Sequence, residues 1–246
     1  MNRTPLAAPL LDTASTPAPK TTARPARVPK PTKAEKKAAK RKRQDQRYLV
    51  PLMLAVTRQN IRQILENAEQ HTWQLHDQGM LSLLLSPEVV LTIGSNEDRA
   101  PNTACIQTHR YGYEHMVLSG EAIDTTYVAH LGGLGHARQE ATVDEAGYSP
   151  VGFKVFCGLD EVRTVTLRIG ESVIHTPDEP CCFTLAHGAV VVSRRDVESD
   201  RQTAYFYSRK EARENLPRVA TASSEDVARI VGQALELWRI SSGEAA

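Results

Sequence analysis

The chain has 246 residues and nearly balanced charge, with 30 Lys and Arg, 29 Asp and Glu and a formal net charge of +1. Its longest near-apolar run, residues 49–56, is eight residues long and contains a proline, whereas a membrane-spanning helix needs about 20 apolar residues. Four cysteines at irregular spacing exclude the disulfide framework of a small secreted protein. We therefore expect a soluble protein with no membrane partner, cytoplasmic and nucleoid-associated, or nuclear in a eukaryotic cell.

The balanced total conceals a strong asymmetry between the N-terminal segment and the rest of the chain. Residues 1–47 hold 13 of the 30 basic residues and 3 of the 29 acidic ones, a local charge of +10. The other 199 residues carry 17 basic and 26 acidic side chains, a charge of −9. Such a split is typical of a basic tail that binds a polyanion. It also fits a tail that docks on the acidic body of its own chain.

Residues 1–31 form the first predicted segment, a tail rich in Pro, Ala, Thr and Lys. Seven of the chain's 14 prolines fall here, and proline removes amide donors and favours extended backbone. A segment of this composition buries too little apolar surface to offset the entropy of ordering. We expect the tail to be disordered.

Residues 32–47 form the second segment, a predicted basic helical arm. Thr32 and Glu35 make a capping-box pattern directly after Pro31, ahead of a run of strong helix formers. Basic residues then recur at spacings of three and four, which places most of them along one side of a helix. The predicted phosphate contacts of the arm and the residue preceding it are Lys30, Lys33, Lys36, Lys37, Lys40, Arg41, Lys42, Arg43 and Arg47.

Residues 48–246 are predicted to form a single α+β domain, with one or two helices, a mostly antiparallel β-rich body and an amphipathic C-terminal helix. Pro51 interrupts the first helical pattern, and an apolar stripe follows at positions 54, 57, 61, 64, 65 and 68. Near the C-terminus, Ser223 and Asp226 make a second capping box ahead of a stripe that runs from Val227 to Trp238. That stripe is expected to close the core or to bind a partner helix.

Short β-rich runs separated by turn residues fill the chain between these helices. The predicted strands are residues 81–85, 89–93, 104–108, 115–118, 123–129, 151–157, 162–169, 172–175, 182–186, 189–193 and 203–207. The glycine-rich residues 132–138 match neither the dinucleotide fingerprint nor the P-loop. They are predicted to form a flexible loop.

Two tyrosine pairs beside basic residues are candidate stacking platforms for the bases of a single-stranded nucleic acid. Tyr111 and Tyr113 follow a basic residue, and Tyr205 and Tyr207 precede two. Residues two apart on a strand share a face, and single-strand recognition combines aromatic rings with cations. The alternative is that these are ordinary strand tyrosines with one hydrated end.

Histidines and cysteines occur in two clusters, and neither matches a known metal or catalytic motif. His175, Cys181, Cys182 and His187 lie within thirteen residues, but their spacing is not a zinc pattern. Adjacent cysteines of a strand also point to opposite faces. The second cluster, residues 109–115, holds two histidines and a glutamate as acid–base groups without a supporting motif. We therefore predict no cofactor and no metal site, and assign no catalytic residue.

Together these features predict a non-catalytic, nucleic-acid-associated binding or regulatory protein. Its arm would neutralise phosphates largely irrespective of base sequence. Two alternatives stay open. One is a protein-interaction or scaffold module whose basic tail docks on an acidic partner or on its own acidic body. The other is a hydrolase acting on nucleic acid, with the arm as a substrate tether.

Overall fold

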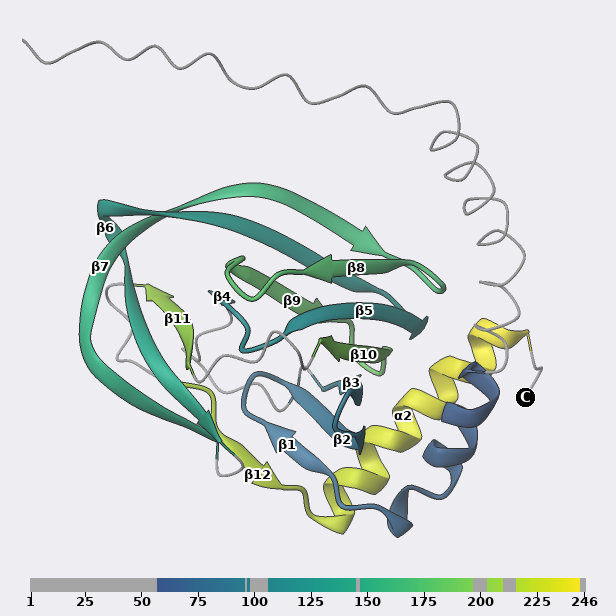
Figure 1. Ribbon diagram of the computed structural model, residues 1–246. Helices are drawn as coiled ribbons and strands as arrows, with labels where there is room; N and C mark the ends of the chain where they lie inside the picture. The colour runs from purple at the N-terminus through teal and green to yellow at the C-terminus, as the bar shows by residue number, and fades with distance from the viewer. Residues whose placement is uncertain are drawn as a thin grey trace, which may run out of the picture. The chain divides into compact units, whose positions relative to one another are not determined.

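The computed structural model describes residues 57–95, 97, 106–144, 147–196, 203–209 and 216–243, all within one compact unit of the chain. The predicted tail and arm, residues 1–47, lie outside the described residues, as does Pro51. The described part is β-rich and ends in a helix (Figure 1). The predicted α+β class is therefore correct in outline, with β-sheet predominating.

Seven strands form the larger sheet, and each strand pairs with its neighbours in antiparallel fashion. In spatial order they are β12 (Val219–Thr221), β1 (Gln74–His76), β2 (Met80–Ser86), β3 (Val89–Gly94), β10 (Val190–Asp196), β5 (Gly112–Ser119) and β8 (Ser172–His175). The predicted strands 81–85, 89–93, 115–118, 172–175 and 189–193 all fall in this sheet, whereas β1 and β12 were not predicted.

Five strands form the smaller sheet, which is dominated by one long hairpin. In spatial order they are β11 (Thr203–Arg209), β4 (Ile106–Gln107), β9 (Cys181–Leu185), β6 (Ala122–Asp144) and β7 (Gly147–Leu167), and the second half of β6 also pairs with β11. The hairpin of β6 and β7 arches over the other strands (Figure 1). It therefore covers the larger sheet.

The hairpin corrects two predictions from the sequence. Residues 132–138 are not a separate loop, because the pairing of β6 with β7 continues on both sides of a register shift between Leu131 and His136. The glycines are accommodated as a bulge, which bends the strand without ending it. Likewise, the predicted strands 151–157 and 162–169 fall on the single strand β7, which ends at Leu167, two residues before the end of the second prediction.

Two helices pack on the outer face of the larger sheet. They are the helical residues 57–66, which lead into the short 3-10 helix η1 (Ala68–Gln70), and α2 (Ser224–Ser242). Ile61 and Leu65 join Ile230 and Trp238 in one buried cluster with the outward side chains of β2 and β3. The predicted capping of the C-terminal helix is confirmed, because the Asp226 amide donates to the Ser223 hydroxyl. In the described part of the chain, neither helix combines the length and apolarity that crossing a membrane requires.

The inner face of the larger sheet packs against the smaller sheet. Val117, Val173 and Val191 from the larger sheet form a buried cluster with Leu167 and Leu185 from the smaller one. This contact holds one end of the two-layer arrangement together. Beyond it, the two sheets separate around a cavity.

Candidate functional site

A cavity of about 800 Å³ lies between the inner faces of the two sheets. Small-molecule sites commonly have volumes of about 300–1,000 Å³. The larger sheet contributes His76, Ser82, Tyr113, His115, Ser193 and Arg195 to its wall, and the smaller sheet contributes Gln107, Tyr148, Cys181, Phe183 and Phe206. The cavity is therefore the strongest candidate site in the described part of the chain.

The strand register brings the polar wall residues together from distant parts of the sequence. Across β10, β5 and β8 it aligns Arg195, Tyr113 and His175 in one row, and Ser193, His115 and Val173 in the next. Residues two apart on a strand share a face, so both rows lie on the inner face. Four of these six residues, Arg195, Tyr113, Ser193 and His115, line the cavity.

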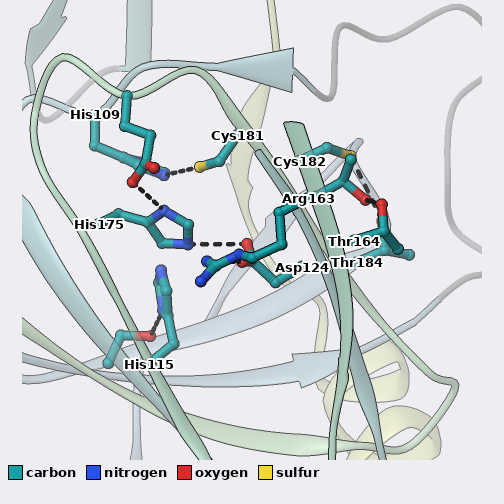
Figure 2. Close-up of polar contacts among 12 residues, drawn as sticks. His109, His115, Asp124, Arg163, Thr164, His175, Cys181, Cys182 and Thr184 are labelled. Atoms are coloured by element: carbon teal, nitrogen blue, oxygen red, sulfur yellow. Dashed lines mark hydrogen bonds and ion pairs between the residues drawn. The ribbon is translucent and has the colours of Figure 1, made fainter. Parts of the chain in front are cut away.

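His175 lies at the centre of an ionic cluster in which its own side chain and that of Asp124 are fully buried (Figure 2). Its Nε2 atom is 2.9 Å from an Asp124 oxygen, in an ion pair that lacks hydrogen-bond alignment. Its Nδ1 atom is 3.1 Å from a Glu179 oxygen, and Arg163 holds the other Asp124 oxygen at 3.1 Å. Burial alone lowers the pKa of His175, but the Asp124 carboxylate and Cys181 raise it to about 10. His175 is therefore an imidazolium at neutral pH.

Cys181 begins β9 and places its thiol beside His109, whose Nε2 atom lies 3.1 Å from the sulfur (Figure 2). Burial raises the pKa of the Cys181 thiol, but the neighbouring His109 and His175 lower it to about 7. Cys182 points the other way, with its sulfur 3.6 Å from the Thr184 hydroxyl. The prediction that the two cysteines occupy opposite faces is confirmed.

His115 is 7% exposed and packs between two aromatic rings. Its imidazole stacks on Phe183 with ring centroids 4.4 Å apart and on Tyr113 at 5.2 Å. Its Nδ1 atom is 2.7 Å from the Ser193 hydroxyl, and its Nε2 atom has no partner among the described residues. Burial, together with nearby His109 and His175, holds the pKa of His115 well below its usual range. The ring is therefore neutral, with one unpartnered nitrogen in the cavity wall.

Cations and tyrosines line another part of the cavity wall. The guanidinium of Arg195 lies 5.4 Å from the ring centre of Tyr111, and that of Arg110 lies 5.1 Å from the same ring. Arg195 also forms a hydrogen bond with the Tyr113 hydroxyl, while its Nε atom is buried without a partner in the described part of the chain. Burial and nearby Arg195 lower the pKa of His76 to about 4, so this histidine is neutral.

The structure places three of the predicted stacking tyrosines at partly buried positions and the fourth, Tyr207, at a buried one. Tyr111 and Tyr113 line the cavity. Arg138 covers the ring of Tyr205 at 4.7 Å, and Tyr207 is only 4% exposed. Tyr111 and Tyr113 therefore meet whatever enters the cavity, and the ring of Tyr207 has no open face for a base. The predicted phosphate-binding residues lie in the arm, outside the described residues.

The histidine–cysteine cluster of the sequence is divided by the fold. His175 and Cys181 join His109, whereas His187 lies 4.0 Å from Glu97. Among the residues that the structure describes, no three His, Cys, Asp or Glu side chains converge on a position for a metal ion.

Asp124 and Arg195 were missed in the sequence because each is a single charge in a β-rich run. Asp124 lies between Ala122 and Thr126, and all three are buried on one face of β6. This alternation along the strand could have indicated that Asp124 points inward. Arg195 lacks such a signal, because Arg194 beside it is exposed on the same strand.

Comparisons with known proteins give no further guide to this site. The sequence matches no protein-family model, and no curated protein is significantly similar to it. The function is therefore inferred from the site itself.

The lowered pKa of the Cys181 thiol predicts how its alkylation depends on pH. The rate of alkylation by iodoacetamide should rise with pH through an inflection near 7, because His109 and His175 favour the thiolate. Mass spectrometry of the Cys181 peptide across a pH series measures this rate. Cys157 is an internal reference, since burial raises the pKa of its thiol. An inflection for Cys181 as high as that of Cys157 would contradict the assigned contacts.

Proposed function

We propose that the body of this protein binds a small organic anion in the cavity between its sheets. The supporting observation is the charge of the wall. Two arginines, Arg110 and Arg195, line the cavity, and no Asp or Glu is found among its described lining residues. Arg195 is partly buried, and its Nε atom is fully buried with no partner among the described residues. A desolvated cationic group of this kind is unfavourable without an anionic partner. A carboxylate or phosphate of the ligand supplies that partner to Arg195.

The rest of the wall suits an apolar group on the same ligand. Met80, Val90, Phe183, Leu185 and Phe206 line the cavity with aliphatic and aromatic surface. Binding sites of this size are typically apolar, with a few polar groups that fix the orientation of the ligand. The proposed ligand class is therefore an organic acid or phosphate ester with a hydrocarbon or aromatic body.

Calorimetric titration of the full chain with 2-naphthoate and with the neutral 2-naphthamide tests this proposal. The two probes share shape and apolar surface, so a difference reports the charge alone. We expect the carboxylate to bind about 10-fold to 100-fold more tightly, the range of a charge-assisted hydrogen bond. Equal affinities, or no binding of the carboxylate, would contradict an anion site.

Association with nucleic acid is the second function that we propose, and it rests on the sequence of the arm. Residues 1–47 carry a charge of +10, whereas the rest of the chain carries −9. Lys and Arg that neutralise phosphates release counterions from the nucleic acid, which favours binding without base recognition. Together the two functions describe a regulatory protein whose body senses a small molecule.

Binding of a fluorescent duplex across a salt series tests the role of the arm. If about six cations contact phosphates, the logarithm of affinity should fall against the logarithm of salt with a slope near −5, from about −0.9 per contact. A variant that starts at Gln46 should lose this binding. Binding that survives the truncation, or is absent at low salt in both forms, would contradict the proposal.

A further inference from the structure

Cys181 has the surroundings of a nucleophile. Its sulfur lines the cavity and lies 3.1 Å from His109 Nε2, so a proton acceptor is in hydrogen-bond contact. The buried His175 also interacts with the thiol, and its two ring nitrogens lie beside the carboxylates of Asp124 and Glu179. A thiol in contact with a base and close to an imidazolium is readily converted to the nucleophilic thiolate.

His115 provides a second observation, which is independent of the contacts of the Cys181 thiol. Its ring lies 6.2 Å from the His109 ring and 5.7 Å from the His175 ring, and its labelled side chain points toward His175 in Figure 2. We assign the Ser193 hydroxyl as the donor and His115 Nδ1 as the acceptor of their hydrogen bond. The imidazole proton is then on Nε2. This proton has no acceptor among the described residues. A fixed, desolvated donor of this kind suits an oxygen that gains negative charge during a reaction.

We propose that Cys181 attacks the carbonyl carbon of an ester or thioester bound in the cavity, with His109 as proton acceptor and His115 as donor to the oxyanion. This inference rests on the proposed anion site, which selects the substrate. The body is then an acyl-transferring hydrolase. Its substrate class is an acyl ester or thioester that carries a second, anionic group.

The reaction balances with water as the only co-reactant. The thiol proton moves to His109 as the sulfur–carbon bond forms, and the carbonyl electron pair moves to the oxygen facing His115. Collapse of this intermediate breaks the bond to the alcohol or thiol, which leaves with the proton from His109. Water then attacks the acyl-cysteine while His109 accepts one of its protons. Collapse of the second intermediate breaks the carbon–sulfur bond, and the sulfur takes the proton from His109, which restores the thiol. The acid product loses its remaining proton to solvent and leaves as a carboxylate.

The sheet geometry limits the length of the substrate. Arg195 and His175 belong to one cross-strand row on β10 and β8, with only β5 between them. Neighbouring strands are about 4.8 Å apart, so the backbones of Arg195 and of His175, the neighbour of Cys181, are about 10 Å apart. A dicarboxylic monoester with several methylenes fits this separation. We therefore choose 4-nitrophenyl hydrogen adipate as the anionic probe and 4-nitrophenyl hexanoate as its neutral control.

The experiment follows nitrophenolate release and the acyl adduct by mass spectrometry, with the full chain. We expect stoichiometric acylation of Cys181, faster with the adipate than with the hexanoate after both rates are divided by those with free cysteine. Cys181→Ser should abolish the adduct, and Cys182→Ser should leave it unchanged. His115→Phe should slow acylation by about 100-fold, the loss for one oxyanion donor. The rate at which iodoacetamide alkylates Cys181 in this variant should stay unchanged. A purely structural role for His115 would lower both rates together.

The outcomes separate this inference from the proposed anion site. Cys181 acylation without a preference for the adipate would support the nucleophile and contradict the anion site. Tight naphthoate binding with no acylation of Cys181 beyond the free-cysteine rate would overturn the nucleophile alone. An adduct that persists in Cys181→Ser would also overturn it. Circular dichroism of each variant excludes unfolding as the cause of a loss.

Discussion

The substitution Asp124→Asn is expected to lower the free energy of unfolding by about 3–5 kcal/mol, the typical loss when one partner of a buried ion pair is removed. The side chains of Asp124 and His175 are both fully buried. The substitution keeps the shape of the side chain, so packing is preserved and only the charge is lost. His175, whose side chain is fully buried, is then left with less compensation in a desolvated environment. Urea denaturation at pH 7 measures the difference.

Glu179→Gln is the matched control for this substitution. Glu179 contacts the same imidazole, but its side chain is 35% exposed and solvent screens the pair. We expect a loss of about 1 kcal/mol or less. Equal losses for the two substitutions would contradict the assigned difference in burial.

The cost of Asp124→Asn should also depend on pH in a defined direction. The pKa of His175 is raised from 6.5 to about 10 in the folded chain, so its ionic stabilisation is complete below pH 6.5 and is lost as the pH rises through 10. The difference between wild type and Asp124→Asn should therefore be largest near pH 6 and shrink toward pH 10. A difference that grows with pH would contradict an imidazolium at this position.

Arg195→Met is expected to weaken the binding of 2-naphthoate by about 30-fold or more. Truncating one partner of a buried, hydrogen-bonded charge pair typically costs about 2–5 kcal/mol, and about 1.4 kcal/mol corresponds to a factor of ten. Methionine keeps much of the aliphatic length of arginine but removes the guanidinium. Affinity for the neutral 2-naphthamide should change little. Titration calorimetry with both probes measures the two effects.

Arg194→Met is the matched control, because Arg194 precedes Arg195 on β10 and its side chain is exposed. It removes the same charge from the opposite face of the same strand. We expect no more than a small change in naphthoate affinity from long-range electrostatics, which salt screens. Equal losses for Arg194→Met and Arg195→Met would show that general surface charge, and not the cavity, drives the binding.

Short sequence patterns correctly predicted the helices and strands that depend on residues close together in the chain. The helix cap at Ser223 and the buried stripe through Ile230 and Trp238 depend on residues three or four apart, so the sequence contains them directly. The start and end of strands such as β3 and β8 likewise follow turn residues in the chain. These elements agree with their predicted ranges to within one residue.

The long hairpin illustrates what local patterns miss. The prediction began a strand only at Val151, directly after Pro150. Proline and glycine are both unfavourable inside a strand. In the fold, β7 pairs only with β6 among the described strands. It is therefore an edge strand, where a sheet tolerates proline. The positive φ of Gly152, 66°, accommodates a local irregularity in the ladder. Tertiary pairing therefore overrides the local signal.

The candidate site was accessible to sequence reasoning only in fragments. His109, His115, His175 and Cys181 were all noticed, but in two unrelated clusters, because no motif spaces them along the chain. Their convergence depends on the pairing of β5 with β8 and on the placement of β9 against β4. Arg195 joins them only through the register of β10. Such long-range pairings are not encoded in any short window of residues.

The most direct test of an anion site in the cavity is a nuclear magnetic resonance titration of the full chain with 2-naphthoate, following the ¹⁵Nε signals of the arginines. We expect the Arg195 signal to shift in a saturable manner, since its Nε atom is buried without a partner among the described residues, and we expect 2-naphthamide to produce no such shift. A titration in which the Arg195 signal stays unchanged while naphthoate binds elsewhere would contradict an anion site in the cavity.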